Sequence, residues 1–185
     1  MAVPSDLTTL DITGTYVLNK SKSDDTDEIL RLQGVGWFTR KAIGFATITL
    51  TIKHYKGDDG LEHIDVDTTL TGGIKGTTEN RILDWQRREH EDHVFGAVVG
   101  QSRRVKLDEL DNEFLKSGWT ADVAEHGTIN SYVESDTPKS GYIWVANQTW
   151  GFEEIDGERR HVRHVDFTGK EGEHIQARLV YDYQA

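Results

Sequence analysis

The stretch Ala46-Thr-Ile-Thr-Leu-Thr-Ile-Lys-His54 decides the fold class of this 185-residue chain. Apolar residues at every second position alternate with threonine and lysine, which is typical of a β-strand with one buried face. His54 continues the apolar face. After a glycine-containing turn at residues 56–60, residues 64–70 repeat the alternation. The two segments are therefore predicted to form an antiparallel hairpin.

The same alternation continues along the chain. Further strands are predicted at residues 13–19, 80–86, 94–106, 128–134, 142–154, 159–168 and 174–183, with turns at 72–76, 155–157 and 169–172. This gives about nine strands. Antiparallel sheets of this size usually close, because closure removes exposed edges. We expect an all-β, antiparallel up-and-down β-barrel that forms a single domain over residues 1–185.

Two short helices are predicted between the first two strands. Asp25 can cap the first, with Glu28 in a capping-box position and Gly34 as its end. The second covers residues 36–43 and ends at Gly44. Such a pair is typical of a lid over a barrel. The acidic insert at residues 107–127 has apolar residues at helix-like spacing, so a short external helix and a long loop are both open.

Composition excludes several functions. The chain has no cysteine, which rules out disulfides and thiolate-bound metals and suits a reducing compartment. It begins without signal-peptide features and has no long apolar run, so we expect a cytoplasmic protein without stable membrane insertion. The net charge of -11 repels phosphate backbones, which argues against nucleic acid as a partner. The oligomeric state stays open.

Four motifs resemble intracellular fatty-acid-binding proteins, members of the lipocalin-like calycins. The runs Gly14-Thr-Tyr-Val-Leu18 and Leu32-Gln-Gly-Val-Gly-Trp-Phe-Thr-Arg-Lys41 resemble the family's opening strand and helix pair. Glu154-Ile-Asp-Gly157 and Val180-Tyr-Asp182 resemble its penultimate hairpin and last strand. The resemblance implies a ten-stranded barrel with a two-helix portal and a hydrophobic ligand inside. The chain is longer than a typical member, mainly between residues 85 and 142.

The family's anion site is altered in this sequence. In the family, two arginines and a tyrosine bind a carboxylate; the resemblance aligns Phe152 and Leu179 with the arginines and leaves only Tyr181. The two-residue alternation of side chains along a strand places Leu179 and Tyr181 on the inner face and Arg178 on the face exposed to water. A buried carboxylate without a partner is unfavourable. We therefore expect a ligand that is neutral, aromatic or anchored differently.

Aromatic and basic residues are candidates for ligand contact. Trp144, Trp150 and Phe152 share one face of a predicted strand, which forms either an aromatic slot for a flat ligand or ordinary core. Arg163 projects into the barrel if it shares the inner face with His161, and lies on a solvated edge otherwise.

The portal is expected to include side chains that gate access to the cavity. Val35, Trp37 and Phe38 lie on or beside the two predicted helices, around the Gly34-Val-Gly36 corner, whose glycines make a flexible hinge. Val35 and Phe38 are therefore counted with the ligand-binding candidates.

Histidines provide weak catalytic candidates. His54 continues an apolar inner face, where a carboxylate on a neighbouring strand could fix its tautomer, although a histidine at a strand end is more often a structural or surface residue. His161 and His164 fall on opposite faces of one strand, so they cannot share a zinc ion. His90 and His93 are assigned to a polar turn. No nucleotide, phosphate-loop or metal motif is present, and no cofactor is expected.

Two functions fit this sequence. The first is an intracellular binding protein for a small hydrophobic, neutral or aromatic molecule. The alternative is a cofactor-free enzyme, an isomerase, cyclase or dehydratase, acting on a polycyclic or polyketide-like substrate in the same cavity. Fold does not decide between them, because different sites occur on one scaffold. The binding protein is the favoured prediction.

Overall fold

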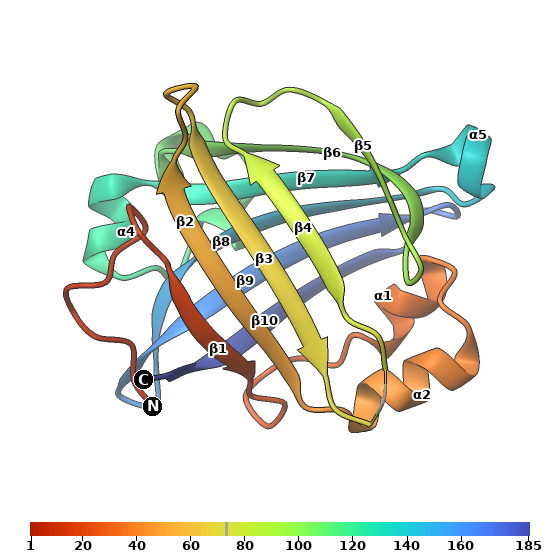
Figure 1. Cartoon of the computed structure of the whole chain (residues 1–185), viewed down its shortest axis with the longest axis horizontal. Coiled ribbons are helices and arrows are strands. Elements are labelled where there is room, and N and C mark those ends of the chain that lie inside the picture. Colours follow the sequence, from red (N-terminus) through yellow and green to blue (C-terminus); the bar gives the residue numbers. More distant parts are fainter. Residues whose placement is uncertain (73) are drawn as a thin grey trace.

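The structure, a computed structural model, describes residues 1–72 and 74–185. Ten strands form one antiparallel sheet in the order β4-β3-β2-β1-β10-β9-β8-β7-β6-β5. The sheet curves round so that its two ends face each other across an interior (Figure 1). The predicted up-and-down barrel with two early helices is thus confirmed. The turn predicted at residues 72–76 includes residue 73, which lies outside the described residues.

The strands follow the predicted order with shifted ends. They are β1 (Gly14–Leu18), β2 (Ile48–Lys56), β3 (Glu62–Leu70), β4 (Thr77–Ile82), β5 (Arg88–Asp92), β6 (Gly96–Val105), β7 (Thr128–Ser135), β8 (Trp144–Ile155), β9 (Glu158–Gly169) and β10 (His174–Gln184). Strand β5 was not predicted from the sequence: its residues, His90 among them, were assigned to a polar turn. All five residues of β5 are polar, so the apolar alternation that signals a strand is missing there.

The helices are short. They are α1 (Asp27–Leu32), α2 (Trp37–Phe45), α3 (Glu113–Lys116), α4 (Ala121–His126) and α5 (Thr137–Ser140), with a 3-10 turn η1 at Leu107–Glu109. The predicted capping box of α1 is wrong. Asp25 Oδ1 accepts the Asp27 N–H at 2.9 Å, so this carboxylate forms a turn one residue before the helix cap at Thr26. None of the described helices is long and apolar enough to cross a membrane.

The register of β8, β9 and β10 places the predicted inner residues side by side. Trp150 pairs with Arg163, and Arg163 pairs with Leu179. One step along, Phe152 pairs with His161, and His161 pairs with Tyr181. Because alternate residues share a face, all of these side chains point into the barrel. Arg163 therefore lies inside, and the solvated-edge alternative is wrong.

The insert at residues 107–127 connects β6 to β7 and contains η1, α3 and α4. It lies at the end of the barrel remote from α1 and α2 (Figure 1). Leu115 and Val123 are fully buried, and the Leu115 carbonyl accepts the Thr149 hydroxyl of β8 at 2.8 Å. The Thr120 N–H donates to the Phe152 carbonyl at 3.0 Å. The insert is thus a packed layer on the outside of β8 and β9 rather than a loose loop.

Candidate active site

Arg163 is the most unusual side chain of the interior. It is 8% exposed, and its guanidinium carbon lies 3.8 Å from the Trp150 ring centroid and 5.5 Å from that of Tyr181. Within the described part of the chain, its Nε and Nη2 have no hydrogen-bond partner. Burial lowers the pKa of Arg163, but a guanidinium keeps its proton in proteins. The barrel therefore contains a buried cation with unfilled donors.

A second arginine beside Trp150 is fully paired. Arg81 Nη2 donates to Glu79 Oε2 at 2.8 Å, and Nη1 donates to the hydroxyls of Ser131 at 2.7 Å and Ser102 at 3.2 Å. Its guanidinium carbon lies 5.0 Å from the Trp150 ring centroid. Burial alone would raise the pKa of Glu79, but Arg81 and Arg163 hold it below its usual value. Arg81 thereby ties β4 to β6 and β7 across the barrel.

A cavity of about 250 Å³ lies between the facing edges of the sheet and the inner side of β6 to β8. Its lining includes Gln33, Glu79, Arg81, Ser102, Trp144 and Gln148. Small-molecule sites usually span roughly 300–1,000 Å³, so the volume of this cavity is just below that range. A second cavity of about 240 Å³ lies beside α1 and α2, where Leu179 forms part of the wall.

His161 is an uncharged histidine in the core. It is fully buried among the rings of Tyr16, Phe152 and Tyr181. Burial, and then the nearby Arg163, lower the pKa of His161 to about 3. Its Nδ1 lies 3.1 Å from the Gly151 carbonyl, which only accepts, so Nδ1 carries the proton. The other ring nitrogen, Nε2, has no hydrogen-bond partner among the described residues.

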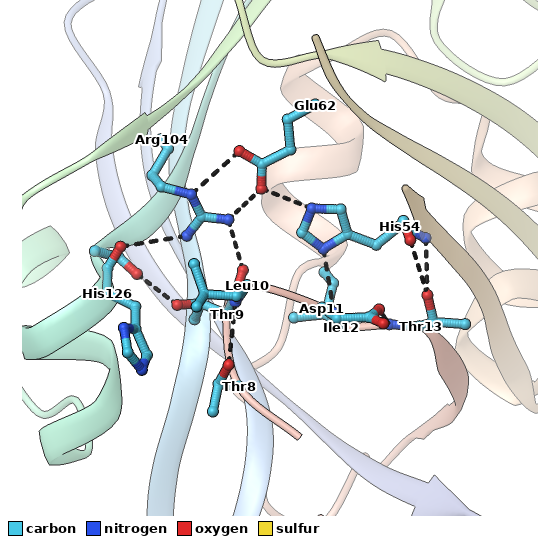
Figure 2. A network of polar contacts seen from close by, with 11 residues as sticks. Thr8, Thr9, Leu10, Asp11, Ile12, Thr13, His54, Glu62, Arg104 and His126 are labelled. Carbon is cyan, nitrogen blue, oxygen red and sulfur yellow. Dashed lines mark hydrogen bonds and ion pairs between the residues drawn. The ribbon is translucent and has the colours of Figure 1, made fainter. Parts of the chain in front are cut away.

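His54, the weak catalytic candidate, belongs to a polar network at the barrel end opposite α1 and α2 (Figure 2). Its Nδ1 accepts the Ile12 N–H at 3.2 Å, which leaves Nε2 to donate to Glu62 at 2.7 Å. Arg104 also binds Glu62, and its Nη2 donates to the Thr9 carbonyl at 2.7 Å. Burial opposes ionisation of Glu62, but His54 and Arg104 lower its pKa to about 2. With both ring nitrogens occupied, His54 fits a structural role.

The remaining predicted ligand contacts are divided between the interior and the surface. Trp144 lines the first cavity and Leu179 the second, whereas Phe152 and Tyr181 are packed in the main hydrophobic core. Val35 is buried. Phe38 lines neither cavity: it is 82% exposed and packs edge-on against Trp37 at 4.8 Å, so its role at the portal stays a prediction. That side of α2 faces outward, so periodicity could place Phe38 on a helix but not choose its direction.

Sequence reasoning missed Glu79, Arg81, Ser102, Ser131 and Gln148. All are polar residues on inner faces, where an apolar alternation is the signal for a buried position. The sequence contained one indication of this pair: Glu79 and Arg81 are two residues apart, and residues at that spacing on a strand lie on the same face.

Comparison with solved structures defines the class of barrel. Lipid binding protein 8 of Caenorhabditis elegans matches with a TM-score of 0.59 at 14% identity, over 93% of this chain and 94% of that one. A Schistosoma mansoni fatty acid binding protein in complex with arachidonic acid matches with a TM-score of 0.56 at 15% identity, over 94% and 96%. The fold is thus that of the fatty-acid-binding proteins. At this identity the likeness concerns the fold alone.

Comparison with curated proteins defines the family. No protein-family model matches the chain. It is 32% identical over 186 residues to the probable pericyclase scpY of Mollisia scopiformis, covering 98% of this chain and 94% of scpY. It is 29% identical over 187 residues to the pericyclase pydY of an Acremonium species, covering 99% and 97%. The chain belongs to the same family as these pericyclases.

This relationship corrects the functional prediction. The binding-protein prediction is wrong, because the relatives that match along their whole length are named as enzymes. They favour the alternative prediction of an enzyme in the same barrel. The resemblance to fatty-acid-binding proteins concerns the scaffold, and a scaffold does not determine which site it carries.

Proposed function

We propose that this chain is a cofactor-free pericyclase that cyclises an unsaturated small molecule inside the barrel. The full-length relationship to two pericyclases carries the proposal. A pericyclic reaction forms new σ bonds from π electrons through one cyclic transition state, so the product is an isomer of the substrate. The reaction needs neither a redox group nor a leaving group. The enzyme contributes by folding the substrate into its reactive shape and by stabilising developing polarisation.

The interior suits such a reaction. Trp144 presents flat apolar surface at the cavity wall, against which a conjugated chain can fold. The two inward-facing histidines are poorly arranged for proton transfer: His161 has a pKa of about 3, and both ring nitrogens of His54 are occupied. A reaction controlled by shape and polarisation does not require an acid–base pair.

The test is conversion of the substrate that pydY or scpY cyclises. Each substrate is incubated with the purified chain, with the corresponding relative and with heat-denatured chain, and the products are separated by chromatography coupled to mass spectrometry. We expect a cyclised isomer of unchanged mass to form faster than in the denatured control. If both substrates bind and neither is cyclised above that control, the proposal fails.

A further inference from the structure

Arg163 carries a positive charge that the described residues leave without a hydrogen-bond partner. The contact with the Trp150 ring offsets part of the cost of burial, because a desolvated cation is attracted to an aromatic face. It does not fill the donors Nε and Nη2. An unfilled buried donor is unfavourable, and more so when it is charged. Such an arrangement is expected where a ligand supplies the acceptor.

The neighbouring groups do not neutralise Arg163. The Glu79 carboxylate is engaged by Arg81, through contacts of 2.8 and 3.2 Å to one oxygen. His161 is uncharged, and burial raises the pKa of Tyr181, which keeps its phenol neutral. One uncompensated positive charge therefore remains at the inner side of this cluster. It favours a ligand group that is negative or strongly electron-rich.

Trp150 lies between Arg163 and the cavity wall. Its indole N–H donates to Gln148 Oε1 at 3.0 Å, and both Gln148 and Arg81 line the cavity. A ligand can reach Arg163 from this cavity only if these side chains rotate. Rotamer changes of this kind are common when ligands and partners bind.

We propose that Arg163 binds a planar pair of oxygens at the polar end of the substrate, either a carboxylate or the enolate of a 1,3-dicarbonyl. The inference rests on the proposed function and names the substrate class for it. Nε and Nη2 form one edge of the guanidinium, whose parallel N–H groups match two oxygens of a planar anion. The contact fixes one end of the chain and withdraws electron density from a conjugated system attached to it. It replaces the expectation of a neutral ligand.

The site differs from the carboxylate site implied by the resemblance to fatty-acid-binding proteins. There the arginines belong to positions held here by Phe152, on β8, and Leu179, on β10. Arg163 lies on β9, between those two strands in the sheet. The cation has therefore moved by one strand, and the two former positions are apolar.

The test compares ligands that share a conjugated tetraene chain and differ only at the polar end. Parinaric acid, its primary amide and a 2-acylcyclohexane-1,3-dione with the same chain are titrated by fluorescence against the purified protein. Variants are Arg163→Met, Arg163→Lys and the matched control Arg178→Met, which removes an arginine from the outer face of the neighbouring strand β10. We expect the acid, the dione or both to bind at least tenfold more tightly than the amide.

That preference should disappear in Arg163→Met, shrink in Arg163→Lys and persist in Arg178→Met. Tighter binding of the acid alone identifies a carboxylate, and tighter binding of the dione alone identifies an enolate. Equal affinity for all three ligands, or an acid preference that survives in folded Arg163→Met, overturns the inference. Circular dichroism shows whether each variant is folded. Binding is measured without turnover, so the two proposals can fail separately. If the substrates are cyclised but acid, dione and amide bind equally, only the role of Arg163 is contradicted. If the binding preference is found but no substrate is cyclised, only the proposed function is contradicted.

Discussion

Strand β9 carries Arg163 and His161 on its inner face and Arg160 and His164 on its outer face, and the two pairs differ in their contacts. On the inner face, Arg163 has unfilled donors and His161 an unfilled ring nitrogen. On the outer face, Arg160 is ion-paired with Glu158 and Asp182. Arg160 Nε is also unfilled, so an unfilled donor alone does not separate the two faces. The two arginines differ in their ion pairs: Arg160 has two carboxylate partners, whereas no carboxylate among the described residues forms an ion pair with Arg163.

The outer histidine shows what a structural role requires. The His164 ring lies between Phe114 and Trp119 of the insert, at centroid distances of 4.7 and 4.3 Å. Its Nδ1 is 2.7 Å from the Phe114 carbonyl, and its Nε2 contacts the buried Glu153 carboxylate. Both ring nitrogens are therefore satisfied, and His164 fastens the insert to β8 and β9.

The largest expected effect is on the outer face. Glu153→Ala leaves His164 buried without its carboxylate, and breaking a buried pair in this way typically costs about 3–5 kcal/mol. Urea denaturation measures the loss of unfolding free energy. Glu154→Ala is the matched control, because that neighbouring carboxylate is exposed. A loss below about 1 kcal/mol for Glu153→Ala would mean that the outer pair does not fasten the insert.

The next effect is pH dependence from His161. Its pKa is about 3 in the folded protein and about 6.5 when unfolded, so the unfolded chain takes up the proton first as the pH falls. The stability loss begins below pH 6.5 and reaches on the order of 2 kcal/mol at pH 5. His161→Gln should flatten this part of the curve of unfolding free energy against pH. His174→Gln, at an exposed histidine, should leave it unchanged; equal slopes in both variants would contradict the buried-histidine interpretation.

A smaller effect of opposite sign is expected for Arg163. Arg163→Met replaces an unpartnered buried cation with an apolar chain of similar length, so the unfolding free energy should rise by about 1 kcal/mol. Loss of ligand binding together with higher stability is typical of a functional site. Thermal unfolding of the ligand-free protein provides the measurement. A clear destabilisation would show that Arg163 holds the core together and that the two faces of β9 do not differ.

The sequence predicted the faces of β9 and β10 correctly because side chains in a strand alternate strictly between its two faces. Once one residue is assigned to the inner face, the faces of all the others in that strand follow. It could not predict β5, whose residues are all polar, or the inner pair of Glu79 and Arg81, because their partners on β6 and β7 are brought close only by closure of the sheet. The insert was recognised by composition alone. Its packing depends on His164 and Glu153, which lie on other elements.

The smallest expected effect is a difference in hydrogen exchange between the insert and the portal helices α1 and α2. None of the nine residues of α2 is buried, whereas the insert buries Leu115 and Val123 completely. Elements with little buried surface open first, well below the free energy of global unfolding. Amides of residues 37–45 should therefore exchange before those of residues 113–126 in ligand-free protein, and ligand should slow them.

Arg40 is one of the contacts that hold α2 in place. It donates to the Val35 carbonyl at 2.9 Å and to Asp27 at 3.2 Å, joining α2 to the corner and to α1. Arg40→Ala should speed exchange in α2 severalfold and raise the ligand association rate, with no change in the insert. Glu153→Ala should do the reverse, because it frees the insert and leaves α2 as it was. If α2 exchanges only with global unfolding, or Arg40→Ala leaves association unchanged, the helices do not gate the cavity, and the ligand passes between the facing edges of β4 and β5.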